Sequence, residues 1–172
     1  ELAKHGNFGI GAFDGMNGEM IALNGTFYQI PVDGIPVTVA PYATTPFAMV
    51  TFFETDQVLY LHNAMNYSEL KAFIDSNLPT LDGTYAVKIN GTFEYAKTRS
   101  VPIQTQPYPA LTDVVANQTI FEFNSVTGTM AGYRCPSFMD GVNVAGYHCH
   151  FITDDKNAGG HMLELITQDV TI

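Results

Sequence analysis

The chain has 172 residues and a formal net charge of −10, and its seven lysine and arginine side chains are too few for clustered phosphate contacts, so we expect no nucleic-acid partner. Its longest apolar runs, such as residues 46–53, are much shorter than the roughly 20 residues of a membrane-spanning helix, so we expect no membrane segment. An apolar content of 46% with 14% charged residues excludes a disordered tail and indicates a packed unit over residues 1–172.

Short apolar segments separated by Asn-Gly and Asp-Gly pairs run along the chain and predict strands joined by turns. Residues 19–30 and 88–95 each predict a hairpin that turns at a central Asn-Gly pair. The segments 131–135 and 145–149 match at four of five positions, which we interpret as two neighbouring strands of one sheet. Strands therefore dominate the expected fold.

Two helices are expected between these strands. Asn66 and Glu69 have the spacing of a capping box, and apolar residues follow at helical spacing until Pro79. A shorter helix is predicted over residues 111–117. Strand-rich segments interrupted by one or two helices predict an α+β fold with mixed or antiparallel sheets.

Four aromatic residues in the first half of the chain suit either the core of a sheet or a dimer face. They are Phe47, Phe52, Phe53 and Tyr60. Core positions are the first expectation, and a homodimer is the alternative.

Three histidines near the C-terminal end suggest a metal site. On a strand, residues i and i+2 point to the same face roughly 6.5–7 Å apart, so His148 and His150 can converge on one ion while Cys149 faces away. Residues 153–160 predict a turn, after which His161 begins the returning strand. Three neutral imidazoles with an open position form the ligand set of a catalytic zinc. Cupin-like sites also contain His-x-His, and histidines without a metal role remain an alternative.

Seven blocks of the sequence, taken together and in order, resemble one enzyme family. They are residues 5–11 (HGNFGIG), 14–20 (DGMNGEM), 97–102 (KTRSVP), 107–109 (PYP), 141–151 (GVNVAGYHCHF), 153–155 (TDD) and 159–161 (GGH). The family is that of the alpha-acetolactate decarboxylases, and the resemblance covers nearly the whole chain. Together the blocks are far more specific than any single motif.

This resemblance implies a zinc enzyme that converts 2-acetolactate, a small anionic 2-hydroxy-3-oxo acid, to (R)-acetoin and carbon dioxide. It implies two sheet-based lobes, approximately residues 1–110 and 111–172, with the metal between them. The family's three zinc ligands match the histidines His148, His150 and His161. Its active-site arginine falls on Arg99, and a carboxylate beside the metal falls on Glu19.

The implied roles are chemically consistent with these residue types. The ketone and alcohol oxygens of acetolactate can chelate one ion, and Zn²⁺ would stabilise the enediolate left when carbon dioxide departs. Arg99 would hold the substrate carboxylate in a bidentate pair. Glu19 would take the hydroxyl proton or return a proton to carbon. Without the resemblance, Glu19 is expected to be a surface carboxylate and Arg99 a surface ion-pair partner.

The chain also departs from the family pattern. Ala12 stands where the family usually has threonine. The resemblance implies further segments at both ends, including a second carboxylate near the C-terminus, so the chain is expected to be a fragment or a shortened relative. Two alternatives follow, namely another metalloenzyme on a sheet scaffold, such as a cupin-like oxygenase or isomerase, and a truncated metal-binding relative without catalysis.

Both cysteines occupy places where the family has other residues. On neighbouring strands, Cys135 and Cys149 predict a disulfide and an oxidising compartment, with two buried free thiols as the alternative. Four Asn-x-Ser/Thr sequons add to this expectation of a secreted glycoprotein, and a cytoplasmic protein is the alternative. They begin at Asn24, Asn66, Asn90 and Asn117.

Overall fold

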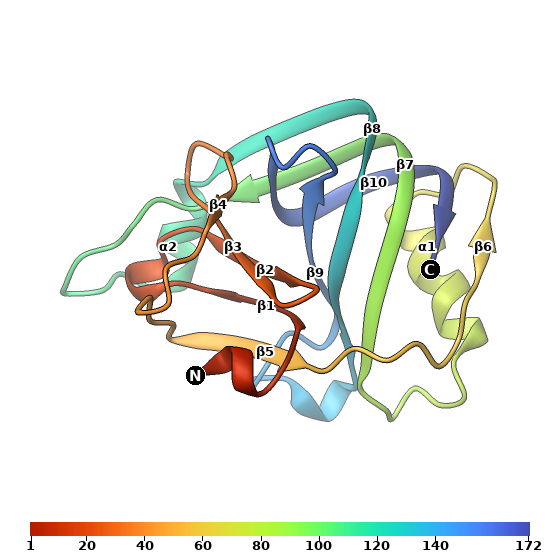
Figure 1. The fold of residues 1–172 in the computed structure, drawn as a ribbon, viewed down its shortest axis with the longest axis horizontal. Helices are drawn as coiled ribbons and strands as arrows, with labels where there is room; N and C mark the ends of the chain where they lie inside the picture. The colour runs from red at the N-terminus through yellow and green to blue at the C-terminus, as the bar shows by residue number, and fades with distance from the viewer.

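The computed structural model describes the backbone of residues 1–172 and every side chain except that of Leu111. Two five-stranded antiparallel sheets form most of the molecule (Figure 1). The first sheet has the order β4-β3-β2-β1-β5 and is built from β1 (Phe8–Ala12), β2 (Glu19–Leu23), β3 (Thr26–Ile30), β4 (Val37–Thr38) and β5 (Phe47–Thr51). The second has the order β6-β10-β7-β8-β9 and is built from β6 (Tyr60–Leu61), β7 (Tyr85–Ser100), β8 (Thr119–Cys135), β9 (Gly146–Thr153) and β10 (Gly159–Thr171).

The second sheet closes on itself. β10 pairs with β7 along most of its length, and its first residues also pair with β9, so β7, β8, β9 and β10 form a small closed barrel. The long strands β7 and β8 curve across the molecule in Figure 1. Because a closed barrel fixes the register of each strand against both neighbours, side chains near the β9–β10 pairing are held from two sides.

Two apolar clusters hold these layers together. One gathers buried side chains of the barrel with those of α1, including Phe93, Phe151 and Leu70. The other lies between the two sheets, where Ile10 and Ile21 of the first sheet are buried with Ile152 of the second and other side chains. The first sheet therefore packs directly on β8 and β9, the strands that lead to the histidines.

Both predicted helices are present. α1 (Tyr67–Asn77) begins with a complete capping box: Asn66 Oδ1 accepts from the Glu69 backbone N–H at 3.0 Å, and Glu69 Oε2 accepts from the Asn66 backbone N–H at 2.8 Å. Leu70 and Ile74 of this helix are buried against the barrel. α2 (Leu111–Ala116) is shorter. The strand-dominated α+β class with antiparallel sheets is confirmed.

Three short 3₁₀ turns complete the secondary structure, namely η1 (Leu2–Lys4), η2 (Asp14–Met16) and η3 (Ser137–Met139). Within the described part of the chain, no helix combines the length and the apolar character that crossing a bilayer would require.

Of the two predicted hairpins, one is confirmed and one is wrong. β2 and β3 are joined by Asn24-Gly25, whose φ angles of 51° and 81° suit a tight hairpin turn. Asn90-Gly91 instead lies inside the continuous strand β7. Gly91 has φ 145°, and a Cβ there would collide with the backbone carbonyl of Asp169 on β10. This glycine therefore permits close approach of two strands rather than a turn.

The two sheets divide the chain between β5 and β6, and not near residue 110. The predicted lobes 1–110 and 111–172 do not coincide with the two sheets, because β7 pairs with β8 and β10 in the second sheet. The boundary lay hidden because no loop-rich segment separates the sheets in the sequence.

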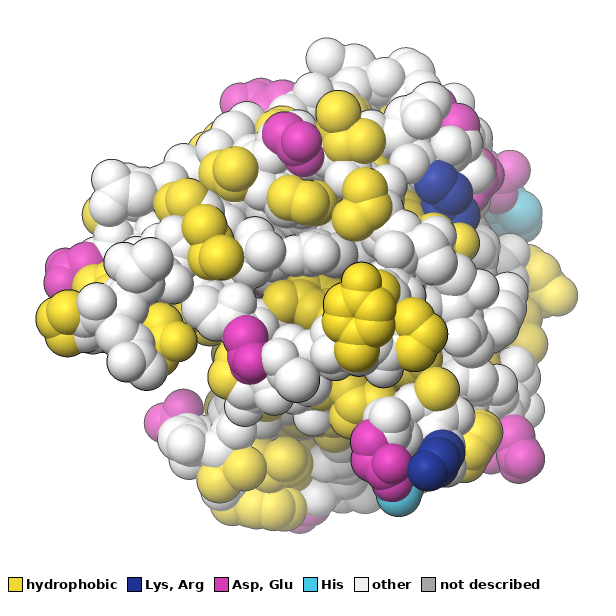
Figure 2. Space-filling view, turned by 60° about the vertical axis from the view of Figure 1, so that its left-hand side comes forward, with side chains coloured by type: hydrophobic (Ala, Val, Ile, Leu, Met, Phe, Trp, Pro, Cys, Tyr) yellow, Lys and Arg dark blue, Asp and Glu magenta, His cyan; other side chains and the backbone are white. Residues whose placement is uncertain are grey.

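The expectation that four aromatic residues are core is only partly met. Phe47 and Phe53 are half-buried, but Phe52 and Tyr60 are 58% and 68% exposed. Figure 2 shows apolar side chains gathered side by side on one face of the molecule, with acidic side chains scattered among them. A dimer face stays a prediction.

The predicted disulfide is wrong, since both cysteines are free and buried. In the β8–β9 ladder, Cys149 lies opposite Gly132, and Cys135 lies opposite Gly146, so the two thiols are three positions out of register. An odd offset sends the side chains to opposite faces of the sheet. Accordingly, Cys149 packs in the cluster of α1 and the barrel, whereas Cys135 packs in the cluster between the sheets.

Candidate metal centre

The strand register brings the three histidines together. His148 and His150 lie on β9, and His161 lies near the start of β10 directly opposite His150. On its other side His161 lies opposite Arg99 of β7. Three neighbouring strands therefore present Arg99, His161 and His150 in one row, and strand alternation places His148 on the same face.

The three imidazoles are close enough to share one ion. Their ring centroids lie 5.1 to 5.3 Å apart, and one nitrogen of each ring lies within 4.8 Å of the others. Zn–N bonds of about 2.1 Å place two ligand nitrogens at most about 4 Å apart, which small ring rotations reach from this arrangement. The three-histidine face predicted from the spacing is present in the structure.

Two of these rings carry buried nitrogens without a hydrogen-bond partner. His150 Nδ1 lies 2.7 Å from the Met20 backbone carbonyl and must donate to it, so His150 Nε2 carries the lone pair. His150 Nε2 and His161 Nδ1 are among the few buried side-chain atoms that lack a partner in the described residues. Buried polar atoms are normally satisfied, and a metal ion would satisfy both.

Burial keeps the three histidines neutral. It lowers the pKa of His148 to about 4 and holds the pKa values of His150 and His161 well below their usual value, with nearby positive charges acting in the same direction. Metal binding requires neutral imidazole, so no proton has to be removed from these rings near pH 7. The donor set therefore fits a divalent ion such as zinc.

Glu19 and Arg99 lie beside the histidines. Glu19 on β2 is 5% exposed; its Oε1 lies 3.2 Å from Arg99 Nη1, and its Oε2 lies 3.3 Å from His150 Nε2. Burial raises the pKa of Glu19 to about 7, against the lowering effect of Arg99. The expectations of a surface carboxylate and a surface ion pair are wrong, because the packing of the sheets buries Glu19 and leaves the Arg99 side chain only 15% exposed.

An acceptor facing an acceptor is a further sign of a missing cation or proton. Since His150 Nδ1 donates to Met20, the lone pair of His150 Nε2 faces a Glu19 oxygen. Two lone pairs at 3.3 Å repel each other unless Glu19 is protonated or a cation lies nearby. The raised pKa of Glu19 agrees with a protonated carboxyl group, and the three-histidine ligand set agrees with a cation.

The structure adds three groups that sequence reasoning missed. The Met20 backbone carbonyl orients His150. Because every residue type has a backbone carbonyl, the sequence could not point to this contact. The Phe47 ring stacks on His148 with centroids 6.1 Å apart. Asn143 Oδ1 lies 3.4 Å from His148 Nδ1, and its position in the block 141–151 was an available signal.

Ala12 lies next to this centre. It is buried and directly opposite Glu19 in the β1–β2 ladder. A threonine here would add a hydroxyl beside the carboxylate, so the departure from the family pattern falls at the centre itself.

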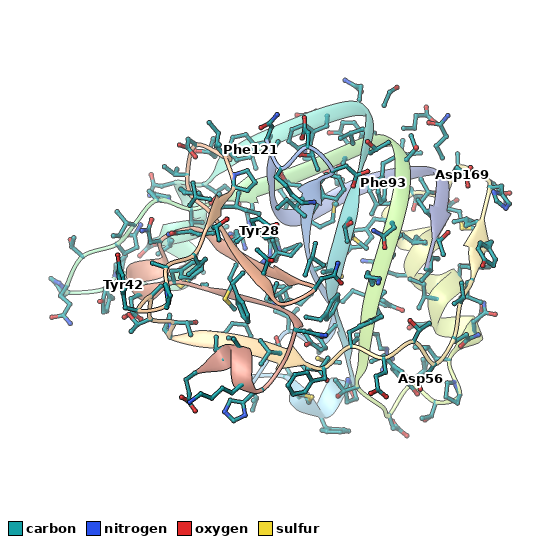
Figure 3. The ribbon with its side chains drawn as sticks, in the orientation of Figure 1. Tyr28, Tyr42, Asp56, Phe93, Phe121 and Asp169 are labelled. Carbon is teal, nitrogen blue, oxygen red and sulfur yellow. The ribbon has the colours of Figure 1, made fainter. Side chains whose placement is uncertain are left out.

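A separate cavity of about 560 Å³ lies away from the histidines. It is lined by the connection between β5 and β6, the C-terminal end of α1 and part of β7. Figure 3 labels Asp56 in this connection, on the side of the molecule where α1 lies. None of the three histidines, Glu19 or Arg99 lines this cavity.

Comparison with known proteins identifies the family. The family model described as "Alpha-acetolactate decarboxylase" matches residues 1–172. Curated proteins named alpha-acetolactate decarboxylase are similar to this chain, at 53% identity over 144 residues for the one from Methanosarcina mazei and 40% for the one from Methylococcus capsulatus. These alignments cover 84% of this chain and 50% and 55% of the two relatives. The chain thus spans about half the length of the curated relatives that it matches.

The fold is shared as well. The crystal structure of alpha-acetolactate decarboxylase from Bacillus subtilis strain 168 superposes with a TM-score of 0.97 at 37% identity, covering 99% of this chain and 73% of that one. The match of the whole chain to the family model and the identities of its relatives lead to one conclusion: the chain belongs to the alpha-acetolactate decarboxylase family.

Proposed function

We propose that this protein decarboxylates 2-acetolactate to (R)-acetoin and carbon dioxide, using a zinc ion held by His148, His150 and His161. The observation that carries the proposal is the pair of orphaned histidine nitrogens beside a buried carboxylate and an arginine. Family membership supports the reaction, and the ligand chemistry supports zinc. When bound, the ion supplies a Lewis acid that polarises the oxygens of the substrate.

In this proposal Arg99 holds the substrate carboxylate. Its Nη1 contacts Glu19, and among the described residues its Nε and Nη2 have no hydrogen-bond partner. Those two donors form one edge of the planar guanidinium, which matches a carboxylate in bidentate geometry. Arg99 therefore binds the anion and orients the bond to the departing carboxylate while it keeps its contact with Glu19.

In this proposal Glu19 moves protons. Without a bound metal, burial raises its pKa to about 7, and a general acid–base group works with a pKa close to the operating pH. It accepts the proton of the tertiary alcohol when carbon dioxide leaves and passes it to the carbon that carried the carboxylate. The alcohol oxygen then regains a proton from solvent, which is the one proton that the reaction consumes. Its burial between the two sheets keeps bulk water from competing for this step.

The proposed function is tested by metal removal and restoration. The purified protein should bind about one zinc per chain and produce acetoin from acetolactate; chelation should abolish this activity, and zinc should restore it. The assay is run on this chain and, in parallel, on the chain with the flanking sequence of its gene. Full activity in metal-free protein would overturn the zinc mechanism. Stoichiometric zinc without acetoin from either form would favour the non-catalytic metal-binding relative.

A further inference from the structure

His148 is held by side chains, unlike its neighbour on the same strand. His150 Nδ1 is fixed by the Met20 main-chain carbonyl. Besides the rings of His150 and His161, the half-buried His148 ring has two side-chain contacts, the stacked Phe47 ring of β5 and the Asn143 amide from the connection between η3 and β9. His148 also faces no main-chain acceptor among the described residues, so outside the histidine cluster its ring orientation depends on these two contacts.

The orientation of the Asn143 amide is fixed by its other partners. Asn143 Oδ1 accepts the backbone N–H of Val144 at 2.7 Å. Asn143 Nδ2 points to two sulfur acceptors, Met49 Sδ at 3.0 Å and Cys135 Sγ at 3.5 Å. A flipped amide would place its NH₂ group against an N–H donor and its oxygen against two sulfurs, so it is disfavoured.

The connecting segment itself is anchored. The backbone N–H groups of Val142 and Asn143 both donate to the Met139 carbonyl at 3.0 Å, which ties the turn to η3. Asn143 is therefore presented from a hydrogen-bonded turn. The atom that this turn places 3.4 Å from His148 Nδ1 is an acceptor.

An acceptor at this place selects one tautomer of the neutral ring. Hydrogen bonding to Nδ1–H leaves the lone pair on Nε2, whereas the opposite tautomer would set the Nδ1 lone pair against the amide oxygen. Outer hydrogen bonds of this kind orient metal-ligating histidines and raise their affinity for metal. Phe47 stacking alone constrains the plane of the ring but does not distinguish its two nitrogens.

We propose that Asn143 is a positioning residue that fixes His148 as the Nδ1–H tautomer and so directs His148 Nε2 to the metal. This inference rests on the proposed function only for the presence of a metal. It assigns Asn143 to metal retention and not to substrate binding. A chain that lacks the Asn143 amide keeps all three ligands but holds the ion more weakly.

The tautomer is tested in the metal-free full chain by ¹⁵N-detected NMR of the histidine rings. In the wild-type chain, His148 should carry its proton on Nδ1, and in Asn143→Ala it should shift toward the Nε2–H form. Asn143→Asp keeps an acceptor oxygen at this position and should retain the wild-type tautomer. An Nε2–H ring in the wild-type chain would overturn the proposal even if neither variant folds.

Zinc affinity gives a second readout, measured by competition with a chromophoric chelator. Asn143→Ala should weaken zinc binding about 10- to 100-fold, and Asn143→Asp should restore most of the loss. Asn117→Ala is the matched control, because Asn117 lies just after α2 and its amide donates to the Asp113 carbonyl on the surface. This control should leave zinc affinity unchanged.

The two proposals fail in different ways. Tight zinc binding with equal affinity in the wild-type chain and Asn143→Ala would overturn the role of Asn143 and leave the proposed function standing. A wild-type chain that binds no zinc would overturn the proposed metal site, and the NMR tautomer would then decide the role of Asn143 by itself.

Discussion

The Glu19 carboxylate shows what single residues contribute to this centre. It comes from β2 of the first sheet and contacts a guanidinium from β7 and an imidazole from β9. A buried carboxylate is stable only with such partners, because charge without them is costly away from water. The sequence offers no local sign of this, since the partners of Glu19 lie 80 and 131 residues further along the chain.

Replacing Arg99 with lysine tests the role of its planar donors. Arg99→Lys keeps one positive charge near Glu19 but loses the two-donor edge, so kcat/KM for acetolactate should fall about 10- to 100-fold. The loss is measured by acetoin formation in zinc-loaded protein. Lys97→Arg is the control, because Lys97 lies two residues before Arg99 and pairs with Glu164 at a half-exposed site. This substitution should leave kcat/KM nearly unchanged. An unaffected rate in Arg99→Lys would show that this side chain does not clamp the substrate.

At the scale of elements, the sequence predicts what is local and misses what is decided by packing. The β2–β3 turn and the α1 capping box depend on neighbouring residues, and both are correct. The spacing of His148, His150 and His161 predicts their common face because strand alternation and one turn suffice. Asn90-Gly91 has the same letters as a hairpin turn, but its partner strand β10 lies far along the chain, so only the structure reveals its role.

Two glycine substitutions separate backbone strain from steric collision. Gly25 and Gly91 both have positive φ, but a Cβ on Gly25 meets open space, whereas one on Gly91 meets the Asp169 carbonyl. Gly25→Ala should cost about 1 kcal/mol of unfolding free energy, and Gly91→Ala should cost about 3 kcal/mol. Urea denaturation measures both. Equal losses would mean that β7 and β10 separate without penalty at this point.

At the scale of the molecule, burial perturbs ionisable groups well beyond the histidines. Desolvation raises the pKa of the Cys149 thiol to about 12 and also raises the pKa values of Tyr67, Tyr133 and Tyr147. All four belong to or pack against the two apolar clusters. The same packing that closes the core therefore holds a set of weak acids in their neutral forms.

Stability should consequently fall in alkali. In the unfolded chain, cysteine and tyrosine lose their protons near pH 8.5 and pH 10, whereas the folded chain retains them, so the unfolded state is favoured as pH rises. The contribution of the neutral Cys149 thiol to the free energy of unfolding is fully present below pH 8.5. Between about pH 9 and 12, Cys149 alone should lower the free energy of unfolding by about 1 kcal/mol per pH unit. Urea midpoints at pH 8, 9.5 and 10.5 measure this loss. Cys149→Ala should flatten the decline, and a profile identical to the wild type would contradict the assignment.

Secretion, glycosylation and dimer formation stay predictions. Of the four sequon asparagines, Asn66 caps α1 and the amide nitrogens of Asn90 and Asn117 already donate, to the Thr129 hydroxyl and the Asp113 carbonyl.

The candidate centre draws its groups from both sheets. The three histidines and Arg99 come from the closed barrel, whereas Glu19, the Met20 carbonyl and Phe47 come from the first sheet. A substitution in the first sheet that keeps these three groups leaves their contacts with the histidines intact. In evolutionary terms, we expect the two sheets to change together at the residues of the centre and independently elsewhere.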